Sequence, residues 1–134
     1  MRERLRHLVV AIALLAAGCA RVEPIQTVDN RPIATAGRTL TGDQVERAIV
    51  AAGLRRGWSF IRSEPGLLRG THSSHGHTLV LEVPFDAMRY SIRVASSSNL
   101  RAGDGTIHRT ANRWIRSLQQ DIDAELARAA IAKA

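Results

Sequence analysis

The sequence predicts an α+β fold in which two helices pack on one face of a four-stranded antiparallel meander sheet, in the order α-β-β-β-β-α. Three observations lead to this prediction. Apolar residues recur with a helical period in residues 41–53 and again from residue 106 almost to the end of the chain. Between these segments, residues 57–94 contain short stretches with a period of two, separated by turn residues. Residues 40–134 are therefore expected to form a single small domain.

The first helix is expected to begin at Thr41. Thr41 and Gln44 have the spacing of a capping box, and Leu40 and Val45 have that of a hydrophobic staple. The apolar stripe of this helix consists of Val45, Ala48, Ile49 and Ala52. Gly53 is expected to end the helix in the left-handed conformation that glycine adopts readily.

Four strands are expected between the helices. Residues 57–63 and 67–73 flank Pro65 and Gly66, which are the residues that a type II turn favours. Residues 77–84 and 88–94 alternate between apolar and polar side chains. Short connections of this kind predict neighbouring antiparallel strands.

The second helix is expected from Thr106 onward. Its sheet-facing residues are Ile107, Ala111, Trp114, Ile115, Leu118 and Ile122, with Trp114 at the centre of the stripe. Three acidic residues later on the helix are interpreted as surface charge: Asp121, Asp123 and Glu125.

The first twenty residues have the organisation of an export signal. Arg2, Arg4 and Arg6 precede an apolar run over residues 8–17. As a helix this run covers about 15 Å, roughly half of the hydrocarbon thickness that a spanning helix crosses. A transmembrane helix is therefore not expected. The run leads into Leu15-Ala16-Ala17-Gly18-Cys19, which ends in the single cysteine of the chain.

This ending resembles the lipobox of bacterial lipoproteins, with Ala16 at a position where leucine is commoner. The resemblance implies that residues 1–18 are a lipoprotein signal peptide, cleaved just before Cys19. It also implies that Cys19 carries a thioether-linked diacylglycerol and usually an amide-linked third acyl chain. Two or three acyl chains anchor a protein to a bilayer stably, whereas one does not. The alternative is an ordinary secretory signal cut after Ala20, which discards the cysteine.

Residues 19–39 are interpreted as the lipidated N-terminus followed by a flexible tether. Pro24, Pro32, Gly37 and scattered polar residues leave no sustained period in this segment. Fully extended, such a tether reaches on the order of 70 Å. By resemblance to the enterobacterial sorting rule, Ala20 after the cysteine implies attachment to the outer membrane, with the domain facing the periplasm.

The formal net charge of +7 falls to +5 when residues 1–18, with three arginines and one glutamate, are removed. An exported chain meets almost no nucleic acid, so nucleic acid is not expected as a partner. Anionic envelope material or another envelope protein fits the charge better. The alternative is that the basic balance reflects the arginine-rich composition of a whole proteome, since Lys133 is the only lysine.

His72, His75 and His77 form the most chemically suggestive cluster. If residues 73–76 form the loop of a hairpin, His72 and His77 face each other with Cβ atoms about 5 Å apart, and His75 closes over them. Three imidazoles suit zinc or copper, although no carboxylate in the loop orients them. A metal-binding envelope lipoprotein is therefore the alternative function, while the leading interpretation assigns no metal and no other cofactor.

A second cluster lies on the predicted C-terminal helix. Arg109, Arg113 and Arg116 form a basic ridge opposite the apolar stripe, suited to phosphate or acidic glycan unless it is merely solvated. His108 and Asn112 lie at the margin of this ridge and are expected to tie the helix to the loop of residues 96–105 by hydrogen bonds. These five residues are the candidate interaction surface.

The chain also resembles a group of small uncharacterised lipoproteins of Gram-negative bacteria, whose pattern is S-x-N-L, then I-H, then Y-N-x-W-I and a leucine. The strings GWSF and LTGDQVERAI take part upstream, and Ala111 stands at the tyrosine position. The residues that match the pattern are Ser98, Asn99, Leu100, Ile107, His108, Asn112, Trp114, Ile115 and Leu118. The resemblance implies an envelope location and this fold, and it implies no particular activity.

No nucleophile with a base, no paired carboxylates and no phosphate-binding loop stands out in the sequence. The leading hypothesis is a lipid-anchored, non-catalytic structural or binding module of the cell envelope. The metal-binding lipoprotein is the alternative, and a hydrolase acting on wall or lipid comes third.

Overall fold

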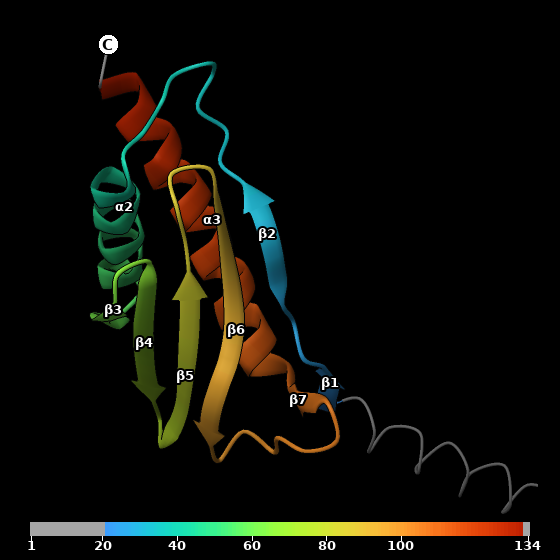
Figure 1. Ribbon diagram of the computed structural model, residues 1–134. Helices are drawn as coiled ribbons and strands as arrows, with labels where there is room; N and C mark the ends of the chain where they lie inside the picture. The colour runs from blue at the N-terminus through green and yellow to red at the C-terminus, as the bar shows by residue number, and fades with distance from the viewer. Residues whose placement is uncertain (1–20, 133–134) are drawn as a thin grey trace, which may run out of the picture.

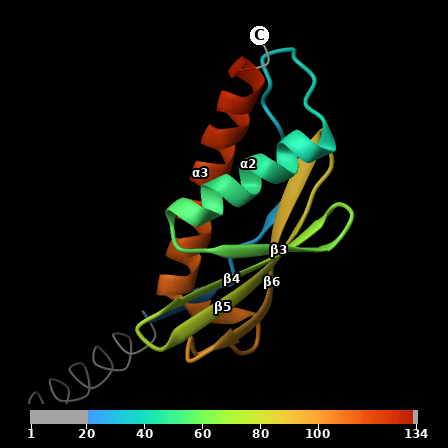
Figure 2. The same ribbon diagram turned by 90° about the vertical axis from the view of Figure 1, so that its left-hand side faces the viewer.

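The computed structural model describes residues 21–132, which form an α+β fold with two helices on one face of an antiparallel sheet (Figures 1 and 2). The main sheet has five strands in the order β2-β6-β5-β4-β3, and β1 pairs with β7 in a separate two-stranded sheet. The helices are α2 (Gly42–Arg55) and α3 (Arg109–Ala132). The strands are β1 (Val22–Pro24), β2 (Val28–Pro32), β3 (Ser59–Glu64), β4 (Leu67–Ser74), β5 (His77–Pro84), β6 (Arg89–Ser98) and β7 (Thr106–His108). The predicted fold class is confirmed, but the main sheet has one strand more than predicted.

The hydrophobic core lies between the main sheet and the two helices. The alternation in β5 is confirmed, because Leu79, Leu81 and Val83 are fully buried on its helix-facing side. The helices contribute buried residues at the predicted helical spacing: Val45, Ala48, Ile49 and Ala52 from α2, and Ala111, Ile115, Leu118 and Ile122 from α3. The periods of two and 3.6 therefore locate most of the core correctly.

The segment interpreted as a flexible tether instead contributes two strands. β2 is an edge strand antiparallel to β6, with Val28 buried opposite Ile92. The backbone N–H of Asn30 also donates to the Ser91 hydroxyl at 2.9 Å. β1 pairs with β7, so that Val22 lies opposite His108. Most of residues 22–32 are thus part of the fold rather than a spacer before it.

α2 begins as predicted but ends two residues later. The capping box is present, since Thr41 and Gln44 each accept a backbone hydrogen bond from the other. Gly53 is buried inside the helix, and the positive φ of +80° belongs to Gly57. A Cβ on Gly53 would lie 2.4 Å from the Phe60 ring. Gly53 is therefore required for close packing of Phe60, and its predicted role as a helix stop is wrong.

Two tight turns set the registers of β3, β4 and β5. Gly66 has a φ of +78°, in agreement with the predicted turn between β3 and β4. Between β4 and β5 the turn consists of only two residues, His75 and Gly76, both with positive φ, and Ser74 pairs with His77. This two-residue turn matches the right-handed twist of a hairpin, and it replaces the predicted four-residue loop.

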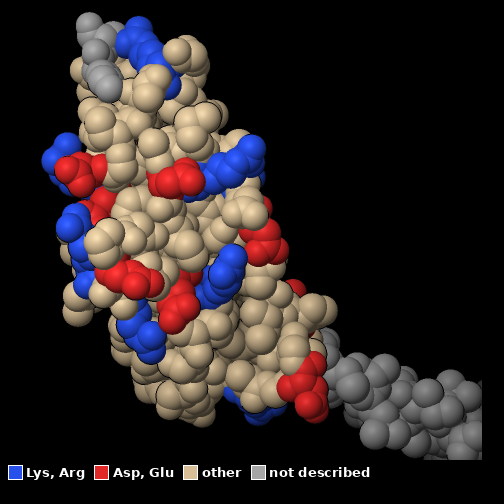
Figure 3. Space-filling model, in the orientation of Figure 1, with Lys and Arg blue, Asp and Glu red and all other residues tan. Residues whose placement is uncertain are grey.

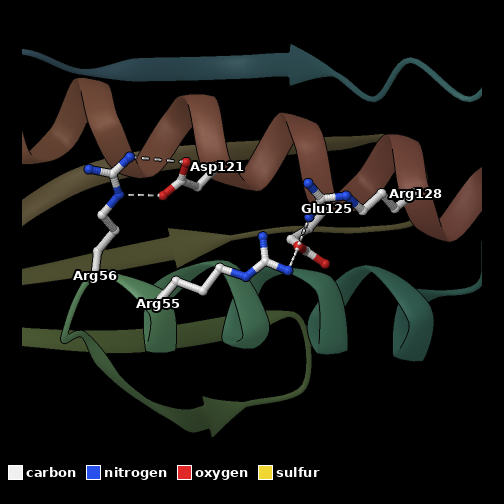
Figure 4. Close-up of polar contacts among 5 residues, drawn as sticks. All are labelled: Arg55, Arg56, Asp121, Glu125 and Arg128. Atoms are coloured by element: carbon white, nitrogen blue, oxygen red, sulfur yellow. Dashed lines mark hydrogen bonds and ion pairs between the residues drawn. The ribbon is translucent and has the colours of Figure 1, made fainter.

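α3 begins at Arg109, three residues later than predicted, because residues 106–108 pair with β1. The acidic residues on α3 are also more than surface charge. Asp121 binds Arg56 at 2.6 Å, and Glu125 binds both Arg55 and Arg128, so that ion pairs join the two helices (Figure 4). On another side of the helix, Asp123 binds Arg31 of β2 and accepts a hydrogen bond from the Tyr90 hydroxyl at 2.6 Å.

Candidate functional site

The N-terminal part of the described chain is held at one end of the molecule, which we call the β1–β7 end. It comprises residues 21–26, the loop of residues 99–105, β7 and the first turn of α3 (Figure 1). The Ile25 N–H donates to the Gly105 carbonyl at 3.0 Å, and the His108 N–H donates to the Leu100 carbonyl at 2.8 Å. The pairing of β1 with β7 and the hydrogen bond from Ile25 join the N-terminal residues to a segment about 80 residues later, and the hydrogen bond from His108 closes the loop against β7.

Asn112 fastens the start of α3 to the N-terminal segment. Its side chain is buried, with an exposed fraction of 2 %. Its Oδ1 accepts from the Gln26 N–H, and its Nδ2 donates to the Pro24 carbonyl, both at 2.8 Å. One amide thus satisfies a donor and an acceptor on the backbone between β1 and β2. The expectation that Asn112 binds the loop of residues 96–105 is therefore wrong, because its partners lie on the other neighbouring segment.

His108 does connect with that loop, through its backbone N–H rather than its ring. The ring is partly buried, and its Nδ1 accepts from the Thr110 N–H at 3.1 Å, which caps the first turn of α3. The pKa of His108 lies below its ordinary value, first because of burial and then because of Coulombic repulsion from nearby basic residues, chiefly Arg101 and Arg109. Accepting this hydrogen bond requires the neutral ring, so the capping role is consistent with that shift.

The side chains around His108 are mainly basic. Arg21 directly precedes β1, and Arg109 is the first residue of α3. Arg101 directly follows Leu100, whose carbonyl accepts a hydrogen bond from the His108 N–H. All three are exposed. Glu23 of β1 and Asp104 of the loop also belong to this end and offset part of its positive charge. The candidate surface predicted from the sequence included Arg109 but not Arg21 or Arg101, because only the fold brings these two residues close to Arg109.

The other members of the predicted arginine ridge lie further along α3. Arg113 and Arg116 are exposed, in agreement with their expected side of the helix. Arg113 donates from Nη2 to the Thr110 hydroxyl at 3.1 Å. The five residues of the candidate interaction surface therefore divide into exposed arginines, a partly buried capping histidine and a buried structural asparagine.

The predicted histidine pair does not form. His72 lies opposite Leu79, and His77 lies opposite Ser74, because the turn is shorter than expected. The His77 ring donates from Nδ1 to the Asn99 carbonyl at 2.6 Å, while His75 occupies the exposed turn. Within residues 21–132, no three His, Cys, Asp or Glu side chains are placed to hold a metal ion together. The facing-pair geometry that motivated a metal site is wrong.

His72 instead belongs to an aromatic cluster that the sequence did not reveal. Its ring centroid lies 5.1 Å from that of Trp58 and 4.5 Å from that of Trp114, the latter edge-on. Its Nδ1 donates to the Gly57 carbonyl at 3.2 Å. Trp58 is buried, whereas Trp114 is only partly buried. Trp114 therefore lies at the margin of the apolar stripe rather than at its centre.

The charges on the view in Figure 3 are mixed in sign rather than gathered into one field. Arg69 of β4 and Glu82 of β5, on neighbouring strands, form an ion pair at 3.4 Å. Between α2 and α3 a shallow groove of about 420 Å³ is lined by Arg47, Glu125, Arg128 and several alanines. The Glu125 carboxylate in this groove already forms ion pairs with Arg55 and Arg128.

Cys19 lies outside the described residues. Neither helix of residues 21–132 combines the length and the apolar character that crossing a bilayer requires. No family model, curated protein or solved structure matches this chain.

Proposed function

We propose that this chain is a lipid-anchored lipoprotein of the cell envelope that acts as a non-catalytic structural or binding module. The proposal rests on the string Leu15-Ala16-Ala17-Gly18-Cys19, which lies at the end of an apolar run too short to span a bilayer. In this proposal Cys19 is the first residue of the mature chain and bears the acyl groups. The described fold then begins almost directly after the anchor, since β1 starts at Val22.

The resemblance of residues 98–118 to small Gram-negative lipoproteins supports the same location. Ala20 after the cysteine favours the outer membrane, with the domain facing the periplasm. The partners are then the membrane, through the anchor, and anionic envelope material or another envelope protein.

A labelling experiment in a Gram-negative host tests this function. Wild-type protein grown with radiolabelled palmitate is expected to incorporate label and to fractionate with the outer membrane. Cys19→Ser is expected to remain as a longer, unlabelled precursor. Cys19→Ser protein that is labelled and cleaved like wild type overturns the anchor, whereas wild-type protein found only in the inner membrane overturns the outer-membrane assignment alone.

A further inference from the structure

We propose that the β1–β7 end of the domain rests on the membrane surface and that Arg21, Arg101 and Arg109 contact the phosphates of anionic phospholipids there. This inference rests on the proposed lipid anchor at Cys19. It follows from two independent features of the chain: the short length of chain between the anchor and the fold, and the residues that the fold gathers at that end.

The first feature is the covalent distance from the anchor. Cys19 is three residues before Val22, and three residues span at most about 11 Å. Val22 is fixed in place because β1 pairs with β7. The backbone after it is fixed as well, by both hydrogen bonds of Asn112. The domain is consequently unable to move away from the anchor on a long spacer.

The membrane is close enough at this distance for its charges to matter. The headgroup layer of one leaflet is about 5 to 7 Å thick, and the screening length at physiological salt is about 8 Å. The acylated cysteine lies at this layer, because its acyl chains are in the hydrocarbon. Side chains of the β1–β7 end are thus within reach of lipid phosphates.

The second feature is the composition of this end. Arg21 is two residues from the anchor. The pairing of β1 with β7 brings Arg109 to the same end, and the hydrogen bond between the backbones of His108 and Leu100 holds Arg101 there. All three arginines are exposed, and they outnumber the two carboxylates of this end, Glu23 and Asp104. A guanidinium binds phosphate with two hydrogen bonds in one plane, which makes arginine well suited to this surface.

The opposite end of the molecule supplies a matched control. Arg38, in the connection from β2 to α2, and Arg47 on α2 are also exposed. The connection lies at the far end from β1 and β7 in Figure 1, and Arg47 lines a groove with the last turn of α3. If the anchor determines orientation, neutralising these two arginines leaves membrane contact unchanged.

The experiment uses the acylated mature chain, purified from membranes and reconstituted into two kinds of vesicle. One contains phosphatidylcholine alone, and the other contains in addition about one third phosphatidylglycerol. Hydrogen exchange of the backbone amides is followed by mass spectrometry. Each arginine near an anionic surface strengthens the binding of this end to the membrane about fivefold. Because Arg101 and Arg109 act together, backbone amides of residues 99–109 are expected to exchange at least about tenfold more slowly on the anionic vesicles than on phosphatidylcholine alone. High salt should remove this protection.

Two double variants separate the basic residues from general crowding at the membrane. Arg101→Gln with Arg109→Gln is expected to abolish the protection, and Arg38→Gln with Arg47→Gln is expected to retain it. Equal protection on both vesicles, no protection on either, or protection of residues 33–40 instead overturns the inference. The mass of the purified chain reports the anchor separately. An acylated chain with an unprotected β1–β7 end overturns this inference alone, whereas an unacylated chain overturns the proposed function as well.

Discussion

Asn112 and Gln26 are joined by a hydrogen bond of 2.8 Å from the Gln26 N–H to the buried side chain of Asn112. The same amide donates to Pro24. Through this one side chain, the first turn of α3 fixes the chain that links β1 to β2, and hence the end of the domain that lies nearest to Cys19 in sequence.

Asn112→Ala is expected to lower the free energy of unfolding by about 1 to 3 kcal/mol, because it leaves the Gln26 N–H and the Pro24 carbonyl without partners near the core. Urea titration measures this. Arg113→Ala is the neighbouring control, and its free energy of unfolding should change by no more than about 0.5 kcal/mol, since Arg113 is exposed. Equal midpoints for the two variants would show that the Asn112 hydrogen bonds contribute nothing to stability.

Gly53→Ala is expected to destabilise the protein by about 1 to 3 kcal/mol, although alanine is normally the better helix former. The new Cβ lies 2.4 Å from the Phe60 ring, and this ring also lies so close to Gly70 that a Cβ there would meet it, so the ring has to shift out of its packed position. Thermal unfolding provides the measurement. Gly42→Ala is the control, because a Cβ there meets nothing within 4 Å, and that variant should be neutral or slightly stabilising. A stabilised Gly53→Ala protein contradicts the packing of Phe60.

Trp114 and His72 are expected to be energetically coupled through their edge-on ring contact. A double-mutant cycle with Trp114→Ala and His72→Ala should give an interaction energy of about 0.5 to 1.5 kcal/mol. The matched cycle pairs Trp114→Ala with His77→Ala, and its effects should add, because His77 binds Asn99 instead. Additivity in both cycles would exclude the aromatic contact as a source of stability.

Stability is expected to fall as the pH drops below about 6.5, in part because of His108. The pKa of His108 is lowered in the folded chain by burial and by Arg101, Arg109, His77 and Arg21. The unfolded chain therefore binds the proton more strongly, so stability declines from the ordinary value of about 6.5 downward until the folded His108 is itself protonated. Urea midpoints between pH 5 and 8 measure the decline.

Two variants isolate the contribution of His108. His108→Asn keeps a residue that caps helices well and removes the titrating ring, so the decline should become shallower. His75→Asn serves as the control, because asparagine also tolerates the positive φ of 50° at that exposed turn. If both variants keep the wild-type pH dependence, the linkage to His108 is wrong.

Local patterns in the sequence predicted those elements whose side chains alternate or recur strongly. β5 was predicted with its observed bounds, since Leu79, Leu81 and Val83 recur with a period of two. The residues Val28–Pro32 that form β2 were missed because four of the five are exposed at a sheet edge and include a proline. The partner of β2 is β6, about sixty residues later, and a local pattern carries no information on such a pairing.

The candidate site was predictable only in part for the same reason. Arg109 is recognisable from its position on a helix, whereas Arg21 and Arg101 join it only through the pairing of β1 with β7 and the Leu100 to His108 hydrogen bond. The histidine pair was misplaced because its register depends on a positive φ at His75, a residue other than glycine. Gly53 was misread because a glycine needed for packing looks the same in sequence as one needed for a turn.

The mass of the N-terminal tryptic peptide decides whether Cys19 is the acylated first residue of the mature protein, as we propose. Because trypsin cleaves after Arg21, we expect a peptide of residues 19–21 whose mass includes a diacylglycerol group, with or without a further acyl chain. A mature chain that begins at Arg21, as the secretory alternative requires, or an unmodified peptide that contains Cys19 would contradict it.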